Sequence, residues 1–483
     1  MCRFFKIVCL SILLSFRGEN ELAAPFSAIN QDILQNGKAY ETLGEATSTI
    51  GHRLTGSLNG AKAEQYAFNL LKKYGYTDVK FQPFEVESWQ RDTVTLDIVP
   101  NKSDNFREVP VVALAYSPVQ ARVNGPIIDV GNGLEEDFEA LKTQVKGNIV
   151  LANLGLINAK AGAKNLHRSE KTALAIQFGA TGIIMVNQVP GNVLLTGTAS
   201  VTGALIGIPA VCISKESGEQ IRQWKKVDRD LHAIVDMRNS SRKTKARNVV
   251  ATLKGKSSER IVIGGHLDSW DLATGATDNG LGSFTIMEIA RAFKALKIKP
   301  KRTIDFVLFM GEEQGLLGSR HAVKEYVRAK QLDKIRFMMN LDMTNNVYGM
   351  SIGGRDELMA FFKTVGEQIK QIDPNFMNEV SSRAGLHSDH QPFMLEGIPT
   401  GAPMGALSTE IINCYHADCD RFNLVNKTQI TNGARFSAML LYALANADEI
   451  PAEKLNTNKT RDQLVAQGLK KELVIGKDWR WVE

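Results

Sequence analysis

Three apolar runs in the second half of the chain each lead directly into residues that can bind a metal or move a proton. The runs are residues 261–264, 304–310 and 337–341. Short runs like these, apolar apart from Asp305 and Asn340, are typical of strands that lie in a sheet covered on both faces. The first leads into His266, the second into Glu312 and the third into Asp342. An open α/β sheet places its site at the carboxyl ends of its strands, so the pattern predicts an α/β fold with one shared site there.

The residue types around these strand ends fit a metal centre. Asp278 follows the first strand, Glu313 follows Glu312 directly, and His416 lies further along in Cys-Tyr-His-Ala-Asp-Cys. Zinc binds imidazole nitrogen and carboxylate oxygen, and a pair of zinc ions needs one bridging carboxylate with further ligands on each side. Two histidines and three carboxylates meet that need. In the Glu312-Glu313 pair, one glutamate can bind metal while the other serves as general base.

Each of these residues also has an ordinary structural interpretation. A histidine after a strand is more often structural than a ligand, and Asp278 could cap the helix expected after it. Asp342 could be a turn residue. Their order along the chain, each at an expected strand end, favours the metal site over these separate interpretations.

Four motifs together resemble the M28 family of zinc peptidases. They are His-Leu-Asp-Ser-Trp-Asp from His266, Ala-Thr-Asp-Asn-Gly around Asp278, Gly-Glu-Glu-Gln-Gly-Leu-Leu-Gly-Ser from Gly311, and Asn-Leu-Asp ending at Asp342. The first motif, and Gly-His-Arg-Leu-Thr-Gly-Ser over residues 51–57, are similar to the carboxypeptidase Q branch. The resemblance implies a mixed, mostly parallel central sheet covered by helices, of the zinc exopeptidase type, with an inserted PA-like α/β domain.

The resemblance also implies a ligand set for two zinc ions per chain. His266 and Asp342 would hold one zinc, and Glu313 and His416 would hold the other. Asp278 would bridge the two ions.

Further residues receive roles from the same resemblance. Glu312 would be the general base and acid, and Asp268 would fix the tautomer of His266 from behind. Asp420 stands where the family often has a supporting aspartate. The residues implied to contact substrate are Ser388, Asp389, His390 and Tyr415. A tyrosine that some relatives use to steady the oxyanion is missing before Ser388, which leaves His390 and Tyr415 as candidates.

The chain divides into five segments on this interpretation. Between residues 120 and 240, short strands and helices alternate without any metal-ligand cluster, as in a separate α/β unit. The expected segments are a signal peptide 1–24, an N-terminal peptidase part 25–120, a PA-like domain 121–240, the catalytic domain 241–450 and a polar tail 451–483.

The N-terminus indicates export. Arg3 and Lys6 precede the apolar residues 7–16, and Ala23 and Ala24 follow, which is the pattern of a secretory signal. The apolar stretch is too short to span a bilayer, and a buried terminal helix is the alternative. We therefore expect a secreted or periplasmic protein, or a lysosomal or secretory one in a eukaryote. An oxidising compartment would allow a disulfide between Cys414 and Cys419, whereas Cys212 is expected in the core.

Charge and composition restrict the partners. The 58 basic and 52 acidic residues are dispersed and leave a net charge of +6, which gives no basic face for nucleic acid. The expected partners are short peptide substrates, and the sequence leaves a homodimer open. Dipeptide hydrolysis and aminopeptidase activity both fit the resemblance. A zinc-free receptor on the same fold, or a PA unit that mainly binds proteins, remain alternatives of another class.

Overall fold

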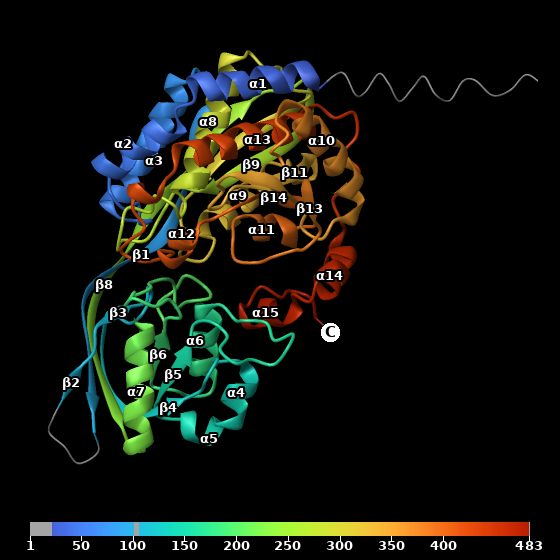
Figure 1. Cartoon of the computed structure of the whole chain (residues 1–483). Helices are drawn as coiled ribbons and strands as arrows, with labels where there is room; N and C mark the ends of the chain where they lie inside the picture. Colours follow the sequence, from blue (N-terminus) through green and yellow to red (C-terminus); the bar gives the residue numbers. More distant parts are fainter. Residues whose placement is uncertain (1–21, 101–105, 483) are drawn as a thin grey trace, which may run out of the picture.

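The computed structural model describes residues 22–100 and 106–482. Most of the predicted signal segment lies outside these residues. The chain forms two lobes, joined by a long antiparallel ribbon of β1 (Val79–Val99) and β8 (His232–Leu253) (Figure 1). No helix among the described residues is long and apolar enough to cross a membrane.

The upper lobe of Figure 1 is built on a mixed sheet. Its strands run in the order β8, β10, β9, β11, β14, β12, β13, and β9 is parallel to both β10 and β11. β11 is also parallel to β14, whereas β10 meets β8, and β14 meets β12, in antiparallel fashion. The added strands are β9 (Ser257–His266), β10 (Arg302–Phe309), β11 (Ile335–Asn340), β12 (Val347–Ser351), β13 (Glu379–Ser381) and β14 (Thr400–Gly405). The predicted mixed, mostly parallel sheet is confirmed.

Helices cover both faces of this sheet, which explains why the three runs seen in the sequence are mostly apolar. Ile263 and Phe306 pack into a cluster with α8 (Gly280–Ala295) and α13 (Lys427–Asn446) on one face. Val262 and Val307 pack on the other face against α9 (Leu317–Arg328) and α11 (His390–Leu395). Successive strand side chains point to opposite faces, and here both faces are buried. The remaining helices of this lobe are α1 (Ala23–Asn36), α2 (Ala39–Thr49), α3 (Leu58–Lys73), α10 (Met359–Ile372) and α12 (Thr409–Asn413).

The lower lobe is an α/β unit of its own. Parallel strands β4 (Gln120–Asp129), β5 (Ile149–Asn153), β6 (Gly182–Val186) and β7 (Ala210–Ile213) pair in that order, and β3 (Val111–Ala113) is antiparallel to β7. Its helices are α4 (Glu135–Ala140), α5 (Lys142–Val145), α6 (Arg168–Gln177) and α7 (Lys215–Val227). The two-residue strand β2 (Arg107–Glu108) pairs with β1.

The polar C-terminal tail is folded over the space between the lobes. It forms α14 (Thr457–Ala466) and α15 (Lys470–Ile475), and Figure 1 shows α15 between the two lobes. Leu473 and Trp481 are buried in a small cluster with Met394 of the upper lobe. A few apolar side chains therefore suffice to fix a segment of polar composition.

Candidate metal centre

The sheet brings three predicted site residues to one edge. His266 is the last residue of β9, while Glu312 and Asp342 follow the ends of β10 and β11. β9 lies between β10 and β11 in the sheet, so the three strand ends are neighbours. Asp278 precedes α8, and His416 lies in the loop after α12.

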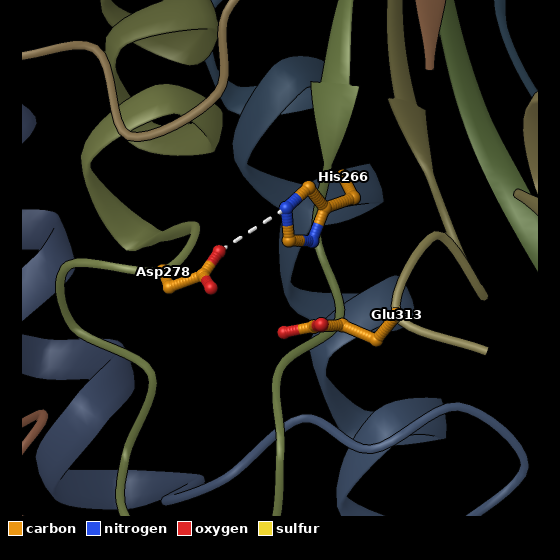
Figure 2. Close-up of side chains that lie close together, drawn as sticks. All are labelled: His266, Asp278 and Glu313. Carbon is orange, nitrogen blue, oxygen red and sulfur yellow. Dashed lines mark ion pairs between the residues drawn. The ribbon is translucent and has the colours of Figure 1, made fainter. Parts of the chain in front are cut away.

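The five predicted ligands lie together, with Asp278 in the middle. His266 Nε2 is 3.3 Å from Asp278 Oδ1 and 3.3 Å from Asp342 Oδ1. His416 Nε2 is 3.0 Å from Asp278 Oδ2 and 3.0 Å from Glu313 Oε2. Figure 2 shows His266, Asp278 and Glu313 pointing toward a common centre. Asp278 thus presents one oxygen to each histidine.

The donor set fits divalent metal ions. Ligand atoms of His266, Asp278 and Glu313 all lie within 4.8 Å of one another, and all three residues are buried. Glu313 Oε1 is buried without a hydrogen-bond partner among the described residues. Buried carboxylates packed this closely repel one another unless a cation or a proton lies between them. Imidazole and carboxylate ligands are those that zinc prefers.

The charges within this group shift its pKa values strongly. Burial alone would lower the pKa of His266, but the carboxylates of Glu312, Asp342 and Asp278 outweigh it and raise that pKa well above its usual value. Burial raises the pKa of Glu312 well above its usual value, and the nearby carboxylates add to this effect while His266 opposes it. A glutamate with a raised pKa takes up a proton more readily than an ordinary glutamate does.

Glu312 and Asp268 lie next to His266. Glu312 Oε2 is 3.9 Å from His266 Nε2, and its main-chain N–H donates to Asp268 Oδ1 at 3.4 Å. His266 Nδ1 lies 3.1 Å from the main-chain carbonyl of Asp268 and 3.7 Å from its carboxylate. The carbonyl is the closer acceptor, and a proton on Nδ1 leaves Nε2 free to face the carboxylates.

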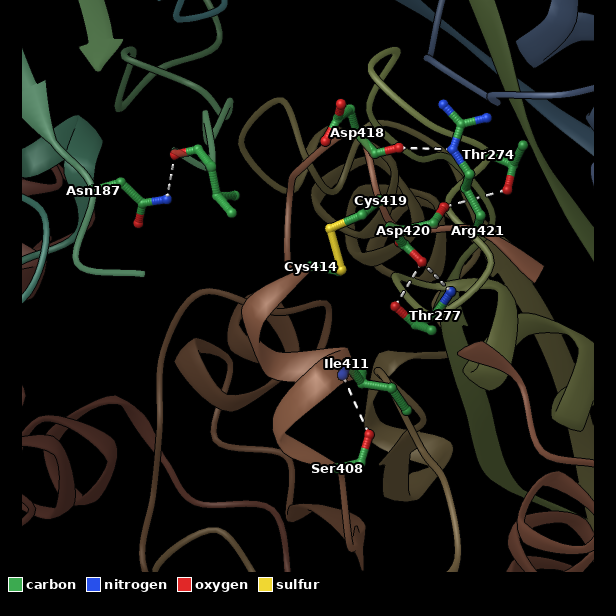
Figure 3. Close-up of a disulfide and its surroundings, with 11 residues drawn as sticks. Asn187, Thr274, Thr277, Ser408, Ile411, Cys414, Asp418, Cys419, Asp420 and Arg421 are labelled. Atoms are coloured by element: carbon green, nitrogen blue, oxygen red, sulfur yellow. Dashed lines mark hydrogen bonds between the residues drawn. A yellow bond between two sulfur atoms is a disulfide. The ribbon is translucent and has the colours of Figure 1, made fainter. Parts of the chain in front are cut away.

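Asp420 contacts the segment that carries Asp278, the proposed bridging residue, and among the described residues no hydrogen bond joins it to the side chain of His416. Its Oδ1 accepts from the main chain and the hydroxyl of Thr277, both at 2.7 Å, and its Oδ2 accepts from the N–H of Asp278 at 3.1 Å. Figure 3 shows the contacts of Asp420 with Thr277 beside the disulfide between Cys414 and Cys419. The disulfide and Asp420 together fix the loop that carries His416 beside the segment that carries Asp278.

The four residues predicted to contact substrate do not lie in a single pocket. Ser388 donates to Asp342 Oδ2 at 2.7 Å and accepts from Asn340 at 2.7 Å, so it orients Asp342. Asp389 is fully buried, and burial raises its pKa to about 8. The Nε2 atom of His390 is hydrogen-bonded to the main-chain carbonyl of Gly385 at 3.0 Å. His390 lines a different cavity from the one that Glu312 lines. Tyr415 alone of the four lines the pocket that contains Glu312.

The pocket beside Glu312 and Glu313 is walled by parts of the chain that carry no metal ligand. The lower lobe supplies the start of α6, the upper lobe the start of α9, and the tail the end of α15. The residues concerned include His167, Arg168, Glu170, Arg320, Leu386, His387, Glu472 and Asp478. Sequence reasoning missed this wall, because its segments show no motif and meet only in the folded chain.

Arg168 makes the closest contact between the two lobes at this site. Its Nη2 lies 2.8 Å from His416 Nδ1, while the carbonyl of Thr196 lies 3.1 Å from the same nitrogen. A Cβ on Gly197 would lie 1.7 Å from Arg168 Nε, so only glycine leaves room for the guanidinium. The lower lobe therefore contacts a predicted metal ligand directly.

An α/β sheet with imidazoles and carboxylates gathered at its strand ends defines the metallopeptidase class, and comparison with known families agrees. Residues 248–441 match the model of peptidase family M28, and residues 108–221 match the model of the PA domain. The chain therefore contains a region similar to the M28 peptidases and a region similar to the PA domain.

Individual relatives cover most of the chain. Aminopeptidase YwaD of Bacillus subtilis is 26% identical over 428 residues, 86% of each chain. Carboxypeptidase Q of Xenopus laevis is 25% identical over 431 residues, 87% of this chain and 89% of the relative.

Solved structures show the same fold. A peptidase M28 precursor from Shewanella amazonensis has a TM-score of 0.75 at 22% identity, covering 91% of this chain and 99% of its own. A zinc aminopeptidase from Bacillus subtilis has a TM-score of 0.63 at 25% identity, covering 86% and 97%.

Proposed function

We propose that the chain is an exported exopeptidase that binds two zinc ions side by side and hydrolyses dipeptides or short peptides. The observation that carries this proposal is the two-sided contact of Asp278. One of its oxygens faces His266 and the other faces His416, as a carboxylate that bridges two metals requires.

The remaining ligands divide between the two sides of Asp278. Asp342 lies with His266, and Glu313 lies with His416. Bound at these positions, two zinc ions would lower the pKa of a water molecule and polarise the scissile carbonyl.

Glu312 moves the proton in this proposal. It lines the pocket beside the ligands, and its raised pKa suits a group that must take up and release a proton. It takes the proton from the attacking water and passes it to the nitrogen of the leaving amine. Tyr415 lines the same pocket and lies against His416, with ring centroids 3.9 Å apart. We assign Tyr415 as the oxyanion donor in preference to His390, which lines another cavity.

The walls of the pocket favour a short substrate. The start of α6, the tail and α9 surround it on the sides away from the strand ends. Carboxypeptidase Q is among the relatives, which supports an exopeptidase that acts on substrates with a free carboxyl end. The relatives and solved structures named as aminopeptidases support release of N-terminal residues as the second candidate.

One experiment tests both points. The purified protein is assayed for zinc per chain and for cleavage of free dipeptides, aminoacyl anilides and peptides blocked at either end. Two zinc ions and preference for free dipeptides support the first candidate. Preference for aminoacyl anilides supports the second, and a zinc-free, inactive protein rejects both.

Export is proposed on two grounds. Residues 3–16, which resemble the basic and apolar parts of a secretory signal, precede α1, and the pairing of Cys414 with Cys419 suits an oxidising compartment. The N-terminal sequence of the protein recovered outside the cytoplasm tests this proposal.

A further inference from the structure

The segment at residues 51–57 has no part in the chemistry described so far, yet it contains a fully buried arginine. Arg53 precedes α3 and is 0% exposed. Its Nε donates to the carbonyl of Leu267 at 2.6 Å, Nη1 to that of Thr274 at 2.7 Å, and Nη2 to that of Gly275 at 2.8 Å. All three nitrogens of the guanidinium thus bond to main-chain oxygens.

These carbonyls belong to the loop that joins two predicted metal ligands. His266 ends β9 immediately before Leu267, and Asp278 follows Gly275 by three residues. The main-chain N–H of Arg53 also donates to Ser269 Oγ at 3.0 Å, near the beginning of the same loop. One residue therefore contacts the loop near both of its ends.

The loop itself is folded too tightly to tolerate alternative positions. Gly275 has φ +60°, and a Cβ there would lie 2.1 Å from the Cβ of Ser269. Gly275 also accepts from the N–H of Gly280 at the start of α8. The guanidinium of Arg53 fills the concave side of this turn, where a planar fork of donors matches three fixed carbonyls.

The charge of Arg53 is not paired directly. Among the described residues, no carboxylate lies within 4.0 Å of its nitrogens. Burial lowers its pKa, and the carboxylates that oppose this effect from further away are those of Asp420, Asp268, Asp278 and Glu313. A buried charge is costly unless it is hydrogen-bonded, so its three carbonyl bonds suggest a role in geometry.

We propose that Arg53 is a positioning residue for the metal centre, holding residues 267–275 so that His266 and Asp278 face each other. This inference rests on the proposed function, because it concerns the same zinc ligands. Arg53 contacts neither substrate nor the reacting atoms. It acts through the loop that carries both ligands.

The test compares Arg53→Lys and Arg53→Met with a matched pair of controls. Arg302 is also buried, at 2% exposure, and donates to the main-chain carbonyl of Ala447 at 2.5 Å and to Glu259 at 2.8 Å. It lies at the start of β10, whereas Glu312 follows the end of that strand. Arg302→Lys and Arg302→Met therefore remove a buried fork of the same kind at the far end of the sheet.

The readouts are zinc affinity, kcat and KM separately, and the unfolding temperature. Loss of support behind metal ligands typically costs 10- to 100-fold in metal affinity or activity. We expect Arg53→Met to weaken zinc binding at least about tenfold and to lower kcat about 100-fold, with KM within about threefold. Arg53→Lys should resemble Arg53→Met, because an ammonium keeps the charge but cannot reach three carbonyls. The Arg302 variants should lower the unfolding temperature without these changes.

The outcomes separate this inference from the proposed function. A wild-type protein without zinc or peptidase activity would reject the proposed function. A wild-type protein with both, and an Arg53→Lys variant with the same zinc affinity and kcat, would overturn only the role of Arg53. If both Arg53 variants fail to fold, Ser269→Ala removes the single contact to the main chain of Arg53. An unchanged zinc affinity in that variant then counts against the inference, and a several-fold loss supports it.

Discussion

The two sides of the candidate active site are built in different ways. The metal side consists of strand ends and short loops within the upper lobe, where His266, Glu312 and Asp342 lie at neighbouring ends of one sheet. The opposite side consists of α6, α9 and the tail, which come from both lobes. The metal side should therefore determine whether the reaction occurs, and the opposite side should determine how well a substrate is held.

Substitution of the bridging residue should have the largest effect. Asp278→Asn leaves one neutral amide between His266 and His416, so both metal positions lose a charged ligand. We expect zinc per chain to fall from two to below one and peptidase activity to fall to background, measured by metal analysis and dipeptide cleavage. Asp271→Asn is the control, because Asp271 lies in the same loop but pairs with Arg91 at 2.8 Å. Two zinc ions retained by Asp278→Asn would contradict the bridging role.

Substitution of Glu312, the proposed base, should reduce catalysis without reducing zinc binding. Glu312→Gln keeps the shape of the side chain but cannot accept the proton, so we expect two zinc ions and a loss of about 10²- to 10⁴-fold in kcat. The raised pKa of Glu312 also predicts a pH effect in the wild type. Because the ionised form is the base, kcat/KM should fall as the pH drops through a pKa above the usual glutamate value. Rapid turnover by the variant would exclude Glu312 as the base.

The same contrast between the two sides explains which parts of the molecule could be predicted from the sequence. The strands that lead to His266, Glu312 and Asp342 are mostly apolar because both faces of the sheet are covered, and each is followed closely by its site residue. This local pattern fixes the sheet and the placing of the ligands around it. The contact of Arg168 with His416 joins residues 248 positions apart, and it depends on the docking of two lobes. No local pattern encodes that docking, just as the tail showed no sign of its place over the pocket.

A change in the wall supplied by the lower lobe should have an intermediate effect. Arg168→Met removes the donor near His416 Nδ1, but the carbonyl of Thr196 remains 3.1 Å away to hold the ring. We expect zinc to remain bound at saturating concentration and kcat/KM to fall about tenfold, a loss of about 1.4 kcal/mol, because the pocket loses a charged group of its wall. Arg222→Met is the matched control, because Arg222 pairs with Asp129 within the same lobe at 2.8 Å. Equal kinetics for the two variants would mean that the lower lobe does not contribute to the site.

The smallest effect should come from the tail. Asp478 binds Arg320 of α9 through two contacts of 2.6 Å and accepts from Gln391 at 2.7 Å, at the edge of the pocket. We expect Asp478→Asn to raise KM for dipeptides two- to threefold with kcat and zinc unchanged, and to lower the free energy of unfolding by about 1 kcal/mol.

A second ion pair of the tail provides the control for Asp478→Asn. Arg480 pairs with Glu396 at 2.6 Å, and neither residue lines the pocket. Glu396→Gln should therefore lower stability by a similar amount and leave KM unchanged. If both variants raise KM equally, the tail acts only through the stability of the fold. If only Asp478→Asn does so, the tail is part of the wall that holds the substrate, although it contributes no group to the chemistry.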